Sequence, residues 1–342
     1  MEHYAGLEVS LNETSVCIVD GAGKIIRETR VASEPEALVG YFSSLEIKVV
    51  RIGLEAGPLS QWLFAGMKGA SLAVELLETR HVRKAFEAMP VKSDRNDARG
   101  IAQLMRLGWF RPVHCKSMSA QETRSLLTAR KLVQSKLHDV ENSLRGILRG
   151  FGLKVGKTTG QKFAGRIEEL VAGHPHLQTI AKALLAVRAV LRAEFAAFEK
   201  QTRRMVRSDM QARLLTSVPA VGPIVALTYA SAIDDPARFK SSKQAGAHFG
   251  LTPKKHQSGE TNYTGRISKI GDASVRTALY EAANVMLTKP VKGGSQLKSW
   301  AMRIKRRAGT NKAKVALARR LAVIMHRMLA DGAPFNAAAA AT

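Results

Sequence analysis

The sequence has 342 residues, 45% of them hydrophobic, which exceeds one ordinary hydrophobic core and predicts two or three domains. Lysine and arginine number 53 against 28 aspartate and glutamate residues, so the formal net charge is +25 and a polyanionic partner is expected. No stretch approaches the roughly 20 apolar residues of a membrane-spanning helix, and the two cysteines give no disulfide framework, so we expect a cytoplasmic protein without a membrane partner.

The first hundred residues predict a mixed α/β domain. Residues 3–9, 14–20 and 24–31 are predicted as three strands of a meander, with Gly21-Ala-Gly23 as the tight turn between the last two. Ser33-Glu-Pro-Glu36 has the form of a capping box and opens a helix. Strands at 47–54 and 71–77 then alternate with helices at 60–68, 81–88 and 93–107. This order is typical of an RNase H-like fold, a mixed sheet flanked by helices.

Four carboxylates occupy positions that such a fold brings together. Glu8 lies in the first strand, Glu55 ends the fourth, and Asp94 and Asp97 share one face of a late helix. For any one of them alone, an ordinary surface charge is the commoner role. Clustered carboxylates require a cation, and beside nucleic acid the expected cation is Mg²⁺, acting in metal-assisted attack on a phosphodiester.

Two later segments carry apolar residues at alternating steps of four and three, the spacing of a coiled-coil seam. They are Val133, Leu137, Val140, Leu144, Ile147 and Phe151 in the first segment, and Leu177, Ile180, Leu184, Val187, Leu191 and Phe198 in the second. The glycine-rich residues 150–160 between them lack the spacing of a P-loop, so we expect a linker. The two helices either pair within one chain or join protomers, and the pattern leaves both alternatives open.

The C-terminal region predicts further helices around two polar motifs. Ser217-Val-Pro-Ala-Val-Gly222 resembles a helix-hairpin-helix turn, which grips a phosphate through backbone N–H groups, although an ordinary proline-glycine turn has the same pattern. Ser258 lies in an expected polar loop over residues 252–269, where Ser-Gly usually serves turn chemistry. Nearby cations would instead let its hydroxyl act as a nucleophile on a phosphate. The candidate nucleic-acid contacts are Lys92, Arg99, Lys254, Lys255, Arg266, Lys269, Arg276, Lys305 and Arg306.

Five blocks, taken in order, give the chain a family resemblance. They are Gly53-Leu-Glu55-Ala-Gly, Lys92-Ser-Asp94-Arg-Asn-Asp97-Ala-Arg99, Ser217-Val-Pro-Ala-Val-Gly222, Phe249-Gly-Leu-Thr-Pro-Lys254 and Gln257-Ser258-Gly259. The chain resembles the DEDD-type insertion-sequence transposases, the bridge-RNA-guided serine recombinases, over nearly its whole length. The resemblance implies a RuvC-like DEDD domain at 1–115, a coiled-coil region at 116–206, and a mainly helical transposase domain at 207–342 that carries the serine.

The resemblance also implies a mechanism and partners. Glu8, Glu55, Asp94 and Asp97 would hold Mg²⁺, and Ser258 would form a covalent phosphoserine with DNA. The family's proteins form dimers that assemble into tetramers, in which the acidic site of one protomer meets the serine of another. A structured guide (bridge) RNA would pair with donor and target DNA, in a bacterial, nucleoid-associated setting.

Two departures from the family pattern bear on activity. The first acidic position is normally Asp and is Glu8 here, whose extra methylene displaces the carboxylate. The turn is usually Pro-Gly-x-Gly, whereas this chain has Pro219-Ala-Val-Gly222. Two rival functions remain open. One is a structure-specific, metal-dependent nuclease in which water attacks and Ser258 is a turn residue. The other is a non-catalytic basic RNA-binding protein whose acidic site is degenerate because of Glu8.

Overall fold

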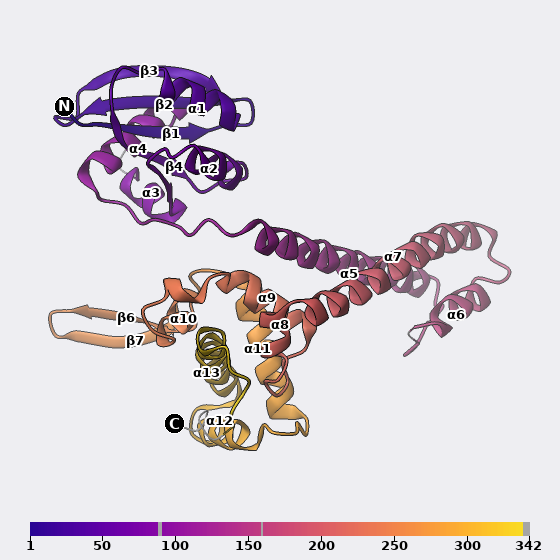
Figure 1. The fold of residues 1–342 in the computed structure, drawn as a ribbon. Coiled ribbons are helices and arrows are strands. Elements are labelled where there is room, and N and C mark those ends of the chain that lie inside the picture. The colour runs from indigo at the N-terminus through magenta and orange to yellow at the C-terminus, as the bar shows by residue number, and fades with distance from the viewer. Residues whose placement is uncertain (88–90, 159, 338–342) are drawn as a thin grey trace. The chain divides into compact units, whose positions relative to one another are not determined.

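The computed structural model describes residues 1–87, 91–158 and 160–337 and divides the chain into two compact units, residues 1–116 and 117–342 (Figure 1). The predicted boundary between residues 115 and 116 lies one residue from this division. The predicted boundary at residue 206 falls inside the second unit. Each unit has hydrophobic clusters of its own and is described separately.

The first unit is built on a mixed five-stranded sheet in the order β3-β2-β1-β4-β5. Strand β1 (His3–Val9) pairs antiparallel with β2 (Glu13–Asp20) and parallel with β4 (Val49–Glu55). Strand β3 (Ile25–Ala32) is antiparallel to β2, and β5 (Val74–Leu77) is parallel to β4. The predicted mixed α/β class is confirmed, and the arrangement is consistent with an RNase H-like domain.

Helices cover both faces of this sheet (Figure 1). Helices α1 (Pro35–Ser43) and α2 (Ser60–Gly69) bury Leu38, Leu63 and Met67 against one face. Helices α3 (Thr79–Ala85) and α4 (Asp94–Leu107) contribute Val82 and Ile101 to the other face. The helix predicted at 81–88 corresponds to α3, and its expected last residue, Ala88, lies outside the described residues.

The predicted capping box does not form. Helix α1 begins after Glu34, which caps it without a side-chain hydrogen bond. The Ser33 hydroxyl is buried, lies 2.8 Å from the Thr14 hydroxyl and donates to the Ser10 carbonyl. A buried hydroxyl needs a hydrogen-bond partner, and the partners of Ser33 lie outside helix α1. The serine therefore links the loop after β1 to the sheet instead of capping the helix.

The second unit begins with two long helices, α5 (Met118–Gly150) and α7 (Pro175–Ser208), which pack antiparallel within one chain. Arg130 pairs with Glu199 near one end of this helix pair, and Arg188 pairs with Glu141 near the other. A short helix, α6 (Lys162–Leu170), follows the glycine-rich segment and buries Phe163 against the pair.

The seam differs from the predicted one. Leu144 and Leu177 are buried as expected, whereas Phe151, Ile180 and Val187 are exposed. On α7 the buried positions include Ala181 and Arg188. An apolar pattern does not predict them, because alanine is small and arginine is charged. Part of the apolar face of α7 is consequently left uncovered within one chain.

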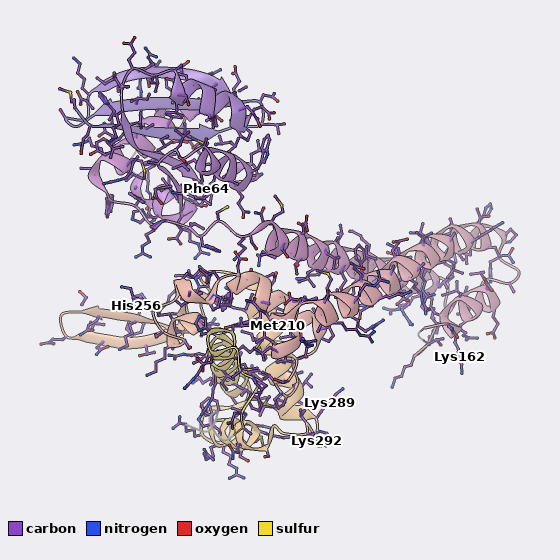
Figure 2. The ribbon with its side chains drawn as sticks, in the orientation of Figure 1. Phe64, Lys162, Met210, His256, Lys289 and Lys292 are labelled. Atoms are coloured by element: carbon purple, nitrogen blue, oxygen red, sulfur yellow. The ribbon has the colours of Figure 1, made fainter. Side chains whose placement is uncertain are left out.

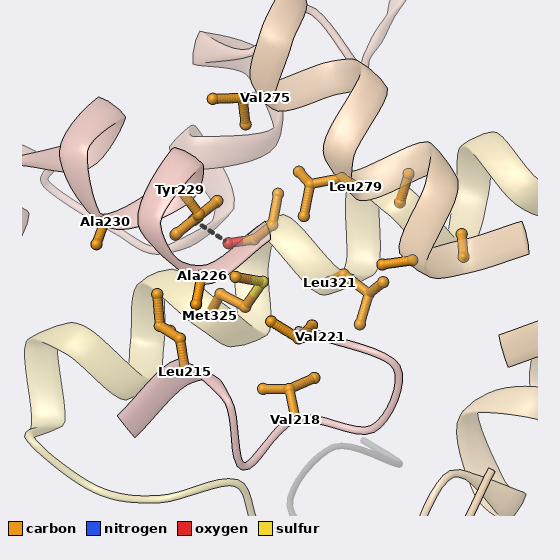
Figure 3. Close-up of a cluster of buried hydrophobic side chains, with 14 of the residues drawn as sticks. Leu215, Val218, Val221, Ala226, Tyr229, Ala230, Val275, Leu279, Leu321 and Met325 are labelled. Atoms are coloured by element: carbon orange, nitrogen blue, oxygen red, sulfur yellow. Dashed lines mark hydrogen bonds between the residues drawn. The ribbon is translucent and has the colours of Figure 1, made fainter. Parts of the chain in front are cut away.

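The remaining helices form a bundle around a separate core (Figure 3). They are α8 (Met210–Leu215), α9 (Pro223–Ile233), α10 (Lys243–His248), α11 (Ala273–Thr288), α12 (Ser295–Ala308) and α13 (Thr310–Asp331), with a 3₁₀ turn at Pro236–Arg238. The buried Tyr229 hydroxyl donates a hydrogen bond to the carbonyl of Ala322, which joins α9 to α13. This region is mainly helical, as predicted.

The expected polar loop around Ser258 is instead a β-hairpin. Strand β6 (Pro253–Ser258) pairs antiparallel with β7 (Thr261–Ile267) through a turn at Gly259 and Glu260. Nearly every residue of the hairpin is exposed, and its side chains extend from both strands (Figure 2). The hairpin residues show no apolar alternation because neither face of the hairpin is buried. In the described ranges, no helix is both long and apolar enough to span a membrane.

Candidate active site

Helix α4 lies directly on β1 because two paired glycines leave room for it. Gly6 of β1 is in register with Gly53 of β4. A Cβ atom added at Gly6 would stand 2.1 Å from the Ala98 carbonyl oxygen, and one at Gly53 would stand 2.8 Å from atoms of Met105. The close approach fixes where the first turn of α4, with Asp97, meets the sheet.

Glu8 and Glu55 follow these glycines by two residues on their strands. Because side chains alternate along a strand, Glu8 points to the same face as Gly6, and Glu55 to the same face as Gly53. Both therefore lie on the α4 side of the sheet. Glu8, Glu55 and Asp97, together with Lys92, line one pocket of about 320 Å³.

The pocket holds its carboxylates in an unusual electrostatic state. Burial raises the pKa of the Glu8 carboxyl to about 7, and repulsion from Glu55 and Asp97 adds to the effect. Burial and then Asp97 also raise the pKa of Glu55, while the Lys92 ammonium group opposes both shifts. Among the described residues, Glu8 Oε2 is a buried oxygen with no hydrogen-bond partner. A buried carboxylate oxygen without a partner is costly unless a proton or a cation compensates it.

Asp94 takes a peripheral place. It is exposed at the start of α4 and accepts a hydrogen bond of 3.2 Å from the Ser10 hydroxyl. It raises the pKa of Glu8 less than Glu55 or Asp97 does. The predicted set of four is therefore brought together as three residues that line the pocket and one nearby.

The donor set suits a hard divalent cation, since carboxylate oxygens are the preferred ligands of Mg²⁺. The buried oxygen of Glu8 has no hydrogen-bond partner among the described residues, which favours this assignment. The side chains are not gathered into a finished coordination sphere: over the described ranges, no three acidic, histidine or cysteine side chains stand close enough together to hold a metal. Mutual repulsion of the carboxylates opposes their closer approach, and a bound cation would offset it.

Glu28 explains the role of two arginines on α4. The Arg99 guanidinium donates to both carboxylate oxygens of Glu28, at 2.5 and 2.9 Å, and Arg95 pairs with the same carboxylate. These hydrogen bonds lower the pKa of Glu28 to about 2. The predicted phosphate contact Arg99 is thus engaged in holding α4 against β3, whereas Lys92 is exposed at the pocket. No motif in the sequence marks Glu28 as the partner of these arginines.

Ser258 ends β6 beside the turn of the exposed hairpin. His256 lies two residues earlier and therefore on the same face of the hairpin. Its ring stacks on Tyr263 of β7, with centroids 4.8 Å apart and an angle of 15° between the planes. The pair could not be predicted from the sequence, because the two rings face each other only through the strand register of the hairpin.

The other predicted nucleic-acid contacts fall into three groups. Lys254, Lys255 and Arg266 are exposed along the hairpin, with Lys269 just beyond it. Nη1 of Arg276 donates to the carbonyls of Phe249, Ile270 and Gly271, so this arginine braces the base of the hairpin. Lys305 and Arg306 are exposed near the end of α12.

The segment that resembles a helix-hairpin-helix turn joins two helices, as expected. Residues 216–222 connect α8 to α9, and Gly222 caps α9 without a side-chain hydrogen bond. Ala220 adopts a left-handed conformation with φ of +67°. The glycine that is usual at this place in the family would take this conformation without the steric cost that alanine carries.

Comparisons with known proteins agree with this arrangement. Residues 5–152 match the profile of the DEDD transposase of IS110 elements, described as a transposase, and residues 212–297 match that of the IS116/IS110/IS902 transposase family. The transposase of insertion sequence IS1111A from Coxiella burnetii is 27% identical over 95% of this chain and 88% of its own length. A probable family 20 transposase from Pseudomonas aeruginosa is 28% identical over 70% of this chain and 72% of its own length.

The first profile covers most of the first unit and helix α5 of the second, and the second profile lies wholly within the second unit. The first contains all four predicted carboxylates, and the second contains Ser258 and its hairpin. Their order along the chain is the order of the sequence blocks. Both parts of the chain that carry predicted site residues are therefore similar to transposases of IS110-type insertion sequences.

Proposed function

We propose that this transposase cuts and rejoins DNA of a mobile element, using a divalent cation held by Glu8, Glu55 and Asp97. The observation that carries the proposal is the pocket itself, which three carboxylates line and in which a buried oxygen of Glu8 has no protein partner among the described residues. The chain has only 28 acidic residues against 53 basic ones, so three carboxylates lining one pocket are not expected from a chance arrangement of surface charge. Asp94 lies near enough to Glu8 to complete the set if the pocket closes around a cation.

The residues of the pocket would share the work of a phosphodiester cut. Mg²⁺, when bound, would supply Lewis-acid stabilisation of charge on the phosphate and on the leaving oxygen. Glu55 and Asp97 would hold the cation in place, and Glu8 would have to lose its proton before binding it. The exposed Lys92 at the same pocket would attract the DNA phosphate.

We propose Ser258 as the nucleophile. Its oxygen would form a bond to phosphorus as one phosphate ester bond breaks, the hydroxyl proton would pass to a base, and the leaving oxygen would take up a proton. Exposure at the end of β6 gives DNA access to the hydroxyl, and Lys254, Lys255 and Arg266 would stabilise charge on the phosphate. Reversal of the same step would rejoin the strand.

The proposed partners are donor and target DNA, a structured guide RNA and further copies of the chain in a dimer or tetramer. A net charge of +25 supports a nucleic-acid partner, and guide pairing would supply sequence recognition that no base-reading motif in the sequence offers. Purification should then yield bound structured RNA, and removing that RNA should abolish sequence-specific DNA binding. Sequence-specific cleavage by RNA-free protein would contradict guidance.

A cleavage assay tests the acidic site. Asp97→Asn and Glu55→Gln should each lower Mg²⁺-dependent cleavage at least 100-fold while DNA binding, measured by gel mobility, changes little. Glu46→Gln is the matched control, because Glu46 is exposed on the same unit and does not line the pocket. Full cleavage by the two pocket variants would overturn the assignment.

A further inference from the structure

A second pocket lies on the helical C-terminal unit, between α12 and α13. Its volume is about 310 Å³, and its lining includes Ser295, Ser299, Trp300 and Arg303 of α12 and Arg320 of α13. None of its lining residues in the described chain is acidic. None of them was singled out as a candidate contact from the sequence.

Two arginines and a tryptophan give this pocket its chemistry. The Arg320 guanidinium lies over the Trp300 ring, 4.7 Å from its centroid. Burial lowers the pKa of Arg320, and the nearby Arg303 charge lowers it further. Both guanidinium groups line the same pocket, so an anion bound there would be attracted by two positive charges.

The surroundings are strongly basic. Residues 295–331, which span both helices, contain ten lysines and arginines and one acid, Asp331. Such a field concentrates polyanions at the surface. This field does not by itself select one ligand, so the class of ligand is inferred from the side chains that line the pocket.

We propose that this pocket binds one unpaired nucleotide of a nucleic acid strand. The phosphate lies between Arg303 and Arg320, because guanidinium groups match phosphate oxygens with paired hydrogen bonds. The base extends the stack that Trp300 and Arg320 already form, as bases do on aromatic rings and guanidinium planes. The hydroxyls of Ser295 and Ser299 offer hydrogen bonds to the sugar or the phosphate.

The size of the pocket favours a nucleotide over a simple anion, since a phosphate group alone would fill only part of about 310 Å³. A duplex would have to unstack and unpair a base before presenting it to the pocket, which disfavours duplex relative to a single strand. The inference rests on the proposed nucleic-acid partner, but it concerns binding alone and needs neither the acidic pocket nor Ser258.

Tryptophan fluorescence offers a direct test. The chain has three tryptophans, Trp62, Trp109 and Trp300, so the double variant W62F/W109F leaves Trp300 as the only reporter. Titrating this full-length protein with a short 5′-phosphorylated single strand should quench the emission to a plateau. Separate DNA and RNA arms identify the source of the nucleotide, and saturable quenching by either supports the proposal.

Charge variants in the same background supply the comparison. Arg303→Gln and Arg320→Gln should each weaken strand binding at least tenfold. Arg307→Gln, on the same helix but outside the pocket, makes the same charge change and should weaken it less than twofold. Arg320→Lys keeps the charge and removes the planar group, so it should reduce the quench while binding stays salt-dependent.

Three results would overturn the proposal. Equal weakening by Arg307→Gln would indicate general electrostatic attraction, and equal quenching by duplex would exclude an unpaired base. Full quenching by inorganic phosphate alone would reduce the pocket to an anion site. Circular dichroism of each variant checks folding, and if Arg320→Gln is unfolded, the Arg303→Gln and Arg320→Lys results decide the matter.

Discussion

Glu8 is a carboxylate with one oxygen buried and with acidic neighbours, which explains its pKa of about 7. Its ordinary value is 4.5, so between these values the folded protein binds a proton that the unfolded chain releases. The favourable contribution of this protonation to the free energy of unfolding is complete below pH 4.5 and is lost as the pH rises through 7. A bound cation would offset what deprotonation of this buried carboxyl costs.

Replacing this carboxylate tests the explanation. Without divalent cations, Glu8→Gln should be more stable than the wild type at pH 8, on the order of 1 kcal/mol after solvent screening, and similar to it near pH 4.5. Urea unfolding at the two values measures the difference. Mg²⁺ at pH 8 should stabilise the wild type and not the variant; an equal effect on both would remove Glu8 from the cation site.

Ala220 carries a second residue-scale cost. Its φ of +67° is in the left-handed region, which costs a non-glycine residue roughly 1 kcal/mol. Ala220→Gly should therefore raise the free energy of unfolding by about 0.5 to 1 kcal/mol, a little less if its half-buried methyl group is missed. Ala247→Gly in α10 is the control and should lower it by a similar amount, because that alanine is helical and exposed. A loss of stability in Ala220→Gly would contradict this reading of the turn.

At the scale of elements, the packing of α4 on β1 sets the geometry of the acidic pocket. Gly6→Ala would place a methyl group 2.1 Å from a backbone oxygen of α4, which must then move away. We expect a loss of about 1 to 3 kcal/mol in unfolding free energy and a larger relative loss of cleavage, because Asp97 moves with the helix. Gly40→Ala in α1 meets no atom within 4 Å and should leave both quantities unharmed. Unchanged cleavage in Gly6→Ala would show that the contact does not position the site.

The elements also show which parts of the fold the sequence could predict. The strands of the sheet were predictable because they are short apolar runs bounded by turn residues. The order of elements placed Glu8 and Glu55 at strand positions and Asp97 on a helix. The distances between these carboxylates depend on the pairing of Gly6 with Gly53. That pairing is set by the register of the strands and is not visible in a local sequence pattern. The hairpin with Ser258 was missed because its residues are polar on both faces.

At the scale of the whole molecule, the uncovered apolar residues of α7 bear on the expected assembly. Ile180, Val187 and Val190 are 41, 48 and 62% exposed, and their steps of seven and three place them on one stripe. If protomers meet here, replacing both valines with glutamate should lower the particle mass in light scattering without lowering the melting temperature. Lys182→Glu, an exposed charge reversal on the same helix, is the control. An unchanged mass would exclude this stripe from assembly.

The most direct test of the central claim maps the covalent intermediate. The full-length protein, with the RNA that accompanies it, is incubated with Mg²⁺ and element-end DNA that carries a trapping nick, and is then digested with trypsin. The peptide His256–Arg266 contains both Ser258 and Tyr263, so fragmentation must locate the attached nucleotide. The account predicts a nucleotide on Ser258 and none in Ser258→Ala, which should still bind DNA. A nucleotide on Tyr263, or efficient cleavage without any adduct, would contradict it, the latter in favour of attack by water.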